Sequence, residues 1–272
     1  PVRNALTREA AISAEHLATG ATIIGKSNYA YHAHFGQAFF SLSTGIERGA
    51  KLALAIYHAL KNDGDFPEPR VLRSYGHNLS DLLTELDLKA EEAGLPPSER
   101  LPRSQIHSGI IRVLTEFASN VTRYYNLDFV MDNVHRDASG DPVKSWYEQV
   151  TVPILEKHLK PAKKTKIQEG ARMASALMES FSIVSHTSES GEHLSSVYEA
   201  SLKTGMTEFV NPYVRMYVLH FARFYSHIMS DLTFAAYKKG MSSIPHLSEF
   251  FAIFHNEDSY LRNRKVWSIY KP

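Results

Sequence analysis

The sequence contains no cysteine among its 272 residues. This absence excludes disulfide bonds, iron–sulfur clusters held by cysteine, thiolate metal sites and cysteine nucleophiles. No excess of one charge is present either, since 30 Lys and Arg stand against 29 Asp and Glu. The balance excludes a uniformly basic nucleic-acid-binding chain and an acidic disordered segment, although local patches remain open.

Long apolar runs are also missing. No stretch approaches the roughly 18 uninterrupted apolar residues that a membrane-spanning helix needs. The first residues carry Arg3, Arg8, Glu9 and Glu15, and they therefore lack the apolar core of a secretory signal peptide. From these two absences we expect a cytoplasmic protein that has no contact with a membrane.

Apolar residues make up 43% of the chain, and in most segments they recur three and four positions apart. This spacing is typical of helices with one buried face, whereas a convincing two-residue alternation between hairpin turns is lacking. We therefore predict an all-α protein. Asn78 and Ser104 are expected to cap two of its helices. The predicted helices cover about residues 28–61, 78 onward, 104–124, 143–158, 166–185, 192–208, 212–239 and 246–255.

A polar, turn-rich stretch at 132–142 is the best candidate for a domain boundary. It divides the chain into an N-terminal helical bundle, residues 1–130, and a helical C-terminal domain, residues 131–272, whose role the sequence leaves open. Two short basic runs lie in the second part, and such runs are either solvated connectors or nucleic-acid contacts. They are residues 160–166 and the group Arg262, Arg264 and Lys265.

Residues 20–27 read GATIIGKS and match the phosphate-binding loop pattern letter for letter. In a true site the loop follows a β-strand, and its amides and lysine hold the phosphates. The preceding residues 10–17 have a helical pattern instead, which favours a glycine-punctuated turn. A nucleotide hydrolase is therefore a weaker hypothesis than the two that the following paragraphs give.

A series of four short motifs resembles the successive helices of HEPN domains, the higher-eukaryote and prokaryote nucleotide-binding helical domains. The resemblance covers about residues 28–130, and it departs from the family at Asn78, where an Asp is usual. The segments that carry it are AFFSL (38–42), GIERGAKL (45–52), YGHNLSDL (75–82) and FA (117–118) leading to RYYNL (123–127).

The resemblance implies an up-and-down HEPN-like helical bundle, here with a helical C-terminal extension, that binds RNA or a nucleotide and forms a homodimer. Many members of the family serve in bacterial toxin–antitoxin, abortive-infection or antiphage defence systems, so a cognate antitoxin or another protein partner is also implied. The matching positions that would bind RNA or a nucleotide are Glu47, Lys51 and Arg123.

Active members of that family are metal-independent endoribonucleases, and the resemblance therefore implies neither a metal nor another cofactor. Their motif places a histidine after an arginine and four to six intervening residues. Among the pairs found here, His77 with Arg70 is the most plausible by position, and Arg73 would add charge to the same cleft. Chance alone predicts roughly two such pairs, and an apolar residue follows each arginine, so enzymatic activity stays open. The three pairs are Arg70 with His77, Arg100 with His107 and Arg215 with His220.

One face of the predicted helix 212–239 carries His220, Arg223 and His227 among several aromatic residues. Two histidines with Asp231 suggest a metal site, but an aromatic-rich helix is more often part of a core or of a dimer interface. The alternative function is therefore a non-catalytic helical module for dimerisation or protein interaction.

Overall fold

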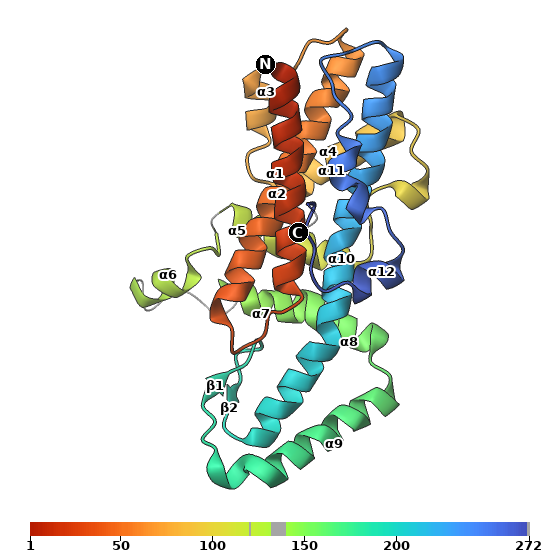
Figure 1. The fold of residues 1–272 in the computed structure, drawn as a ribbon. Helices are drawn as coiled ribbons and strands as arrows, with labels where there is room; N and C mark the ends of the chain where they lie inside the picture. Colours follow the sequence, from red (N-terminus) through yellow and green to blue (C-terminus); the bar gives the residue numbers. More distant parts are fainter. Residues whose placement is uncertain (120, 132–139, 271–272) are drawn as a thin grey trace.

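The computed structural model describes residues 1–119, 121–131 and 140–270. These residues form a helical bundle from which a helical arm projects (Figure 1), and they confirm the predicted all-α fold class. The strands within this part of the chain, β1 (His186–Thr187) and β2 (His193–Leu194), pair antiparallel with His186 opposite Leu194. No helix in the described ranges has the length and apolar character needed to cross a membrane.

The helices of the described residues differ widely in length. The longer ones are α1 (Val2–Ile24), α2 (His32–Lys61), α4 (Leu79–Glu92), α5 (Gln105–Ala118), α9 (Pro161–Met178) and α10 (Val197–Lys238). The shorter ones are α3 (Pro69–Ser74), α6 (Tyr125–Met131), α7 (Pro142–Trp146), α8 (Val152–His158), α11 (Ser248–Phe251) and α12 (Asp258–Asn263). A π-helical segment, η3 (Tyr147–Thr151), joins α7 to α8, and the 3-10 turns are η1 (Pro97–Glu99), η4 (Glu179–Phe181) and η5 (Ala252–Phe254).

Helices α1 and α2 form an antiparallel hairpin whose close packing depends on small residues. A Cβ atom added at Gly20 would lie 2.6 Å from Cγ of Leu42, and one at Gly45 would lie 2.9 Å from the backbone nitrogen of Leu17. Because no side chain separates the helices at these two positions, their backbones can approach each other. Gly20 therefore serves packing.

Helix α10 differs from the sequence prediction, which placed separate helices at 192–208 and 212–239. The chain instead forms one helix from Val197 to Lys238 that continues through Pro212. Proline removes one backbone donor, and the buried side chains of Val210 and Val214 on either side hold the helix together. His193 and Leu194 form β2 and Ser196 caps the helix, so the helix also begins later than predicted.

The third predicted helix is shorter than expected. Helix α5 ends at Ala118, where the hydroxyl of Ser119 donates to the carbonyls of Thr115 and Glu116. Val121 and Tyr124, which lie within the predicted helix 104–124, are outside α5 and exposed.

Helix α9 and the first half of α10 make up the projecting arm (Figure 1). The arm helix begins at Pro161 and ends at Met178, whereas the sequence predicted 166–185. Proline is favoured at the first position of a helix because the lack of its N–H costs nothing there.

One contiguous cluster of buried apolar side chains runs from Leu6 to Trp267, so helices before and after the suggested boundary share a core. Most of the boundary itself, residues 132–139, lies outside the described residues.

Candidate functional site

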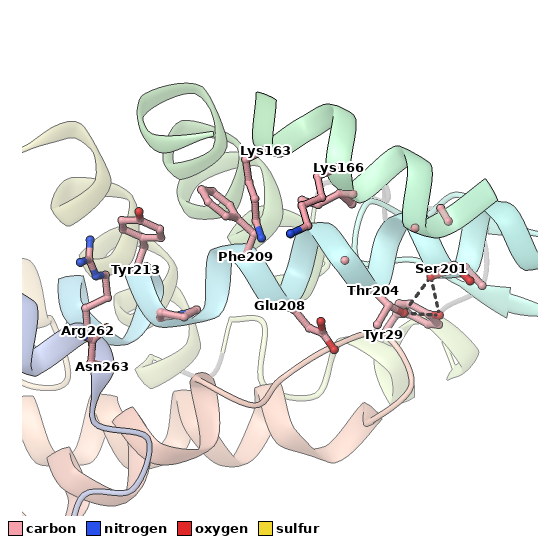
Figure 2. Close-up of a pocket in the computed structure, with 16 residues that line it drawn as sticks. Tyr29, Lys163, Lys166, Ser201, Thr204, Glu208, Phe209, Tyr213, Arg262 and Asn263 are labelled. Atoms are coloured by element: carbon pink, nitrogen blue, oxygen red, sulfur yellow. Dashed lines mark hydrogen bonds between the residues drawn. The ribbon is translucent and has the colours of Figure 1, made fainter. Parts of the chain in front are cut away.

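The arm carries an open groove of about 790 Å³ between α9 and α10. Figure 2 shows the side chains that line it. The lining runs along α10 from Ala200 to Tyr213, a distance of about 20 Å at the helical rise per residue. The groove is therefore elongated along α10. We call this cavity the arm groove.

The arm groove collects basic residues from two segments far apart in the sequence. Lys163 and Lys166 come from α9, and Arg262 comes from α12. Glu208 is the acidic residue of the lining, so the four side chains carry a net charge of about +2. Figure 2 shows both lysine amino groups on the groove side of α9. The two basic runs noted in the sequence therefore meet at one site.

Local packing explains why the lysines flank the groove. Ile167 and Ala171 turn toward α10, where Gly205 leaves room for them: a Cβ at Gly205 would lie 2.7 Å from Cγ2 of Ile167. With these apolar residues fixing the rotation of α9, Lys163 and Lys166 stay at the edge of the contact with their charged ends in solvent.

Aromatic rings form one end of the arm groove. Tyr213 stacks on His158 with ring centroids 4.2 Å apart, and the guanidinium of Arg262 lies 5.3 Å from the Tyr213 centroid. Burial, followed by the charges of Lys157 and Arg262, lowers the pKa of His158, so this ring is neutral at neutral pH. The stack holds Arg262 in place through cation–π attraction.

The opposite end is closed by Tyr29, from the turn between α1 and α2. Its hydroxyl lies 3.2 Å from the carbonyl oxygen of Ala200 and 3.2 Å from Oγ1 of Thr204. Its backbone N–H donates to Glu189 of the β1–β2 turn. The bundle and the arm are thus joined at the groove by hydrogen bonds.

Three residues predicted from the sequence lie together outside the arm groove, on α2 and on the turn between α3 and α4. Nζ of Lys51 donates to Oε1 of Glu47 (2.7 Å) and to the carbonyl of Gly76 (2.8 Å), while Nδ1 of His77 lies 2.9 Å from Oε2 of Glu47. Burial acts to raise the pKa of Glu47, but the bonds from His77 and Lys51 outweigh it and hold that pKa below its usual value.

The carboxylate of Glu47 accepts, so Nδ1 of His77 carries the shared proton and Nε2 is left to the solvent side. We call this arrangement the Glu47–His77 pair. It has the geometry of a histidine base oriented by a carboxylate.

The remaining predicted residues do not join this pair. Arg70 is highly exposed and bonds Glu68 (2.7 Å), and the side chain of Arg73 is exposed on α3. Arg123 packs over the rings of Phe40 and Phe117, at 5.6 and 5.3 Å from their centroids. Phe40 precedes Lys51 by eleven positions on α2, which is about 16 Å along the helix.

The residues that match the phosphate-binding loop pattern have a packing role in this fold. Gly20 lies within α1, so the strand that the motif requires is replaced by a helix. A Cβ at Gly25 would lie 2.4 Å from Nη1 of the buried Arg215, and the hydroxyl of Ser27 donates to the carbonyl of Ile23. The geometry therefore contradicts a phosphate-binding loop at residues 20–27.

Within the described ranges, no group of three or more His, Asp and Glu side chains is placed to hold a metal ion. His220 instead bonds Asp258 and His107, and Asp231 belongs to no such group. No family model, curated protein or solved structure matches this chain.

Sequence reasoning noticed the basic runs but did not predict the arm groove. The missing information was the contact between α9, α10 and α12, which no local pattern contains.

Proposed function

We propose that this protein binds RNA or a nucleotide in the arm groove. The observation that carries the proposal is the convergence of Lys163, Lys166 and Arg262 on one cavity that also contains aromatic rings. Cationic side chains attract phosphates, and adjacent aromatic surface suits bases. The HEPN resemblance of residues 28–130 points independently to the same class of ligand.

The length of the groove favours a single strand of RNA over a free nucleotide. Fluorescence anisotropy with a labelled single-stranded RNA, a duplex of the same sequence and labelled ATP distinguishes these ligands. We expect the single strand to bind most tightly at low salt. The double variant Lys163→Gln/Lys166→Gln should weaken this binding at least tenfold.

A matched control removes two lysines elsewhere. Lys61→Gln/Lys238→Gln changes the net charge equally, and neither residue lines the arm groove. Equal losses in the two double variants, or no loss in the groove variant, would refute the proposal.

An endoribonuclease activity is the catalytic form of this proposal, and the Glu47–His77 pair supports it. The pair supplies a histidine oriented by a carboxylate. This histidine would take the proton from the 2′-hydroxyl, and water would protonate the leaving 5′-oxygen. Such an enzyme would belong to a bacterial toxin or antiphage defence system, and a cognate antitoxin would be its protein partner.

Self-association is the second candidate function, and an apolar row on the arm favours it. Leu177, Phe181 and Ile183 are 73%, 89% and 99% exposed, with Met173 and Met178 beside them in sequence. Monomers rarely expose so many apolar residues in one short segment. Sedimentation velocity of wild type and Leu177→Asp tests whether this row forms a homodimer. A Phe234→Ser variant, altered at an exposed residue of α10, is the control.

A further inference from the structure

A second cavity, of about 620 Å³, lies between α4, the loop that precedes α5, and α10. It shares no lining residue with the arm groove. Arginine and histidine side chains line it from two sides: Arg100 and Arg103 from the loop, Arg223 and His227 from α10. We call it the arginine cavity.

Arg103 is held at the wall by a buried carboxylate. Asp87, 1% exposed, accepts from Nε and Nη2 of Arg100, from the backbone N–H of Leu101 and from Nη2 of Arg103. Burial acts to raise the pKa of Asp87, but the bonds from the two arginines outweigh it, and that pKa stays below its usual value. Asp87 is therefore ionised, and Nε and Nη1 of Arg103 have no hydrogen-bond partner within the described residues.

Arg223 is held on the opposite wall. Its Nη1 donates to the carbonyl of Asn256 (3.0 Å) and to Oδ1 of Asp258 (2.8 Å). The described part of the chain offers no partner to its Nη2 and Nε. Two guanidinium groups, each fixed by a carboxylate behind it, thus present unused N–H groups at one cavity.

A directed chain of hydrogen bonds fixes Asp258 in turn. The backbone N–H of Ser104 donates to Nδ1 of His107 (3.2 Å), so the proton of this neutral ring sits on Nε2. That Nε2–H donates to Nδ1 of His220 (2.9 Å), and Nε2–H of His220 donates to Asp258 (3.1 Å). His107 and His220 therefore position Arg223 through Asp258, and His220 also lines the cavity itself.

The charges of the lining restrict the class of ligand. Three arginines face three acidic residues, and all three nitrogens of Arg100 are bound to Asp87 and Glu91. A balanced lining does not attract a polyanion over a distance, but free guanidinium N–H groups bind a compact oxyanion at short range. Glu99, 3.6 Å from Nδ1 of His227, can accept from a hydroxyl group on the same ligand.

We propose that the arginine cavity binds a small hydroxylated oxyanion, with Arg103 and Arg223 as its guanidinium ligands. The oxyanion is the shared chemistry of a phosphate monoester and a hydroxycarboxylate. Glycerol 3-phosphate and malate represent these two sources, and isothermal titration calorimetry of the full chain with each probe tells them apart.

We expect one probe to bind, and Arg103→Gln or Arg223→Gln to raise its dissociation constant at least tenfold. Arg70→Gln, which removes an exposed arginine bound to Glu68, is the matched control and should leave binding unchanged. Lys163→Gln/Lys166→Gln should also leave binding of the probe unchanged, which would show that the probe does not bind in the arm groove. The proposal is overturned if neither probe binds, or if binding depends on the two lysines and not on the two arginines.

A double-mutant cycle tests the positioning role. His220→Gln should weaken binding of the probe, because it disturbs Arg223. The double variant His220→Gln/Arg223→Gln should therefore bind the probe no more weakly than Arg223→Gln alone. Losses that simply add would show that His220 does not act through Arg223. Circular dichroism of each variant identifies any failure to fold, and Arg103→Gln then remains as the independent test.

Discussion

The Nε2 atom of His107 lies 2.9 Å from the Nδ1 atom of His220, although 113 positions separate the two residues in the sequence. Burial, followed by the charge of the partner ring, lowers the pKa of His107 to about 3. Burial, followed by the charge of Arg223, lowers the pKa of His220 to about 4. Both rings are therefore neutral at pH 7, and the hydrogen bond joins α5 to α10.

The first prediction is that folding stability falls in mild acid because of this pair. In the unfolded chain both rings take up a proton near pH 6.5, whereas in the folded chain they do so only near pH 3–4. The unfolded state thus binds more protons between these values, and the free energy of unfolding decreases as the pH falls through 6.5. We expect a loss of about 2 kcal/mol per ring, and so of about 4 kcal/mol for the pair, between pH 7 and pH 5.

Urea denaturation at the two pH values measures this loss. NMR titration of the imidazole protons checks its origin, since the signals of His107 and His220 should not shift between pH 7 and pH 5. A midpoint near pH 6.5 for either ring would contradict the explanation.

The helical fold was predictable because each helix carries its own pattern. The leucines of α4 recur at helical spacing, and all four of them that the sequence pattern places on one face are buried: Leu79, Leu82, Leu83 and Leu86. Asn78 and Ser104 cap α4 and α5 as predicted, because capping is a local interaction. The helix break predicted at 208–212 and the helix end predicted at 124 were wrong, since tertiary packing and terminal hydrogen bonds decide whether a helix continues.

The sites were less predictable because they are long-range contacts. Glu47 and Lys51 are one turn apart on one helix, and their ion pair is visible in the sequence. Lys163 and Arg262 meet only after α9 and α12 have packed on α10. The Arg–His spacing assigned His107 and His220 to two different Arg–His pairs, whereas the fold joins the two histidines to each other.

The second prediction concerns Gly20, the first glycine of the segment that matches the phosphate-binding loop pattern. Gly20→Ala should destabilise the protein by about 1–3 kcal/mol, because its Cβ would overlap Leu42 where two helices touch. Gly36→Ala is the control on α2, since nothing lies within 4 Å of the added Cβ. There alanine should stabilise by about 0.5–1 kcal/mol through helix propensity. Thermal unfolding of both variants measures the difference, and similar effects would argue against the packing role.

The third prediction concerns salt. If Lys163, Lys166 and Arg262 each neutralise one phosphate, the logarithm of the RNA association constant should fall with the logarithm of the salt concentration at a slope of about −2. Lys163→Gln/Lys166→Gln should reduce the slope to about −0.7, because one contact remains. Anisotropy titrations between 50 and 300 mM salt, roughly the range in which such slopes are measured, provide the values. A wild-type slope near zero would exclude phosphate contacts in the arm groove.

The fourth prediction concerns RNA cleavage at the Glu47–His77 pair. Purified protein incubated with total RNA in EDTA should cleave it, because an acid–base histidine needs no metal ion. His77→Ala should lower the rate by about 100-fold or more, and Glu47→Gln should lower it by about tenfold through loss of ring orientation.

His193→Ala, at an exposed histidine of β2, should leave the rate unchanged and is the matched control. If cleavage is absent, or if His77→Ala cleaves like wild type, the nuclease form of the proposal fails. Binding in the arm groove is unaffected by that result, because Glu47 and His77 contribute nothing to the lining of the groove. Measuring binding and cleavage on the same RNA therefore separates the two functions. Loss of the groove lysines should raise the RNA concentration needed for half-maximal cleavage. Loss of His77 should instead lower the cleavage rate at saturating RNA.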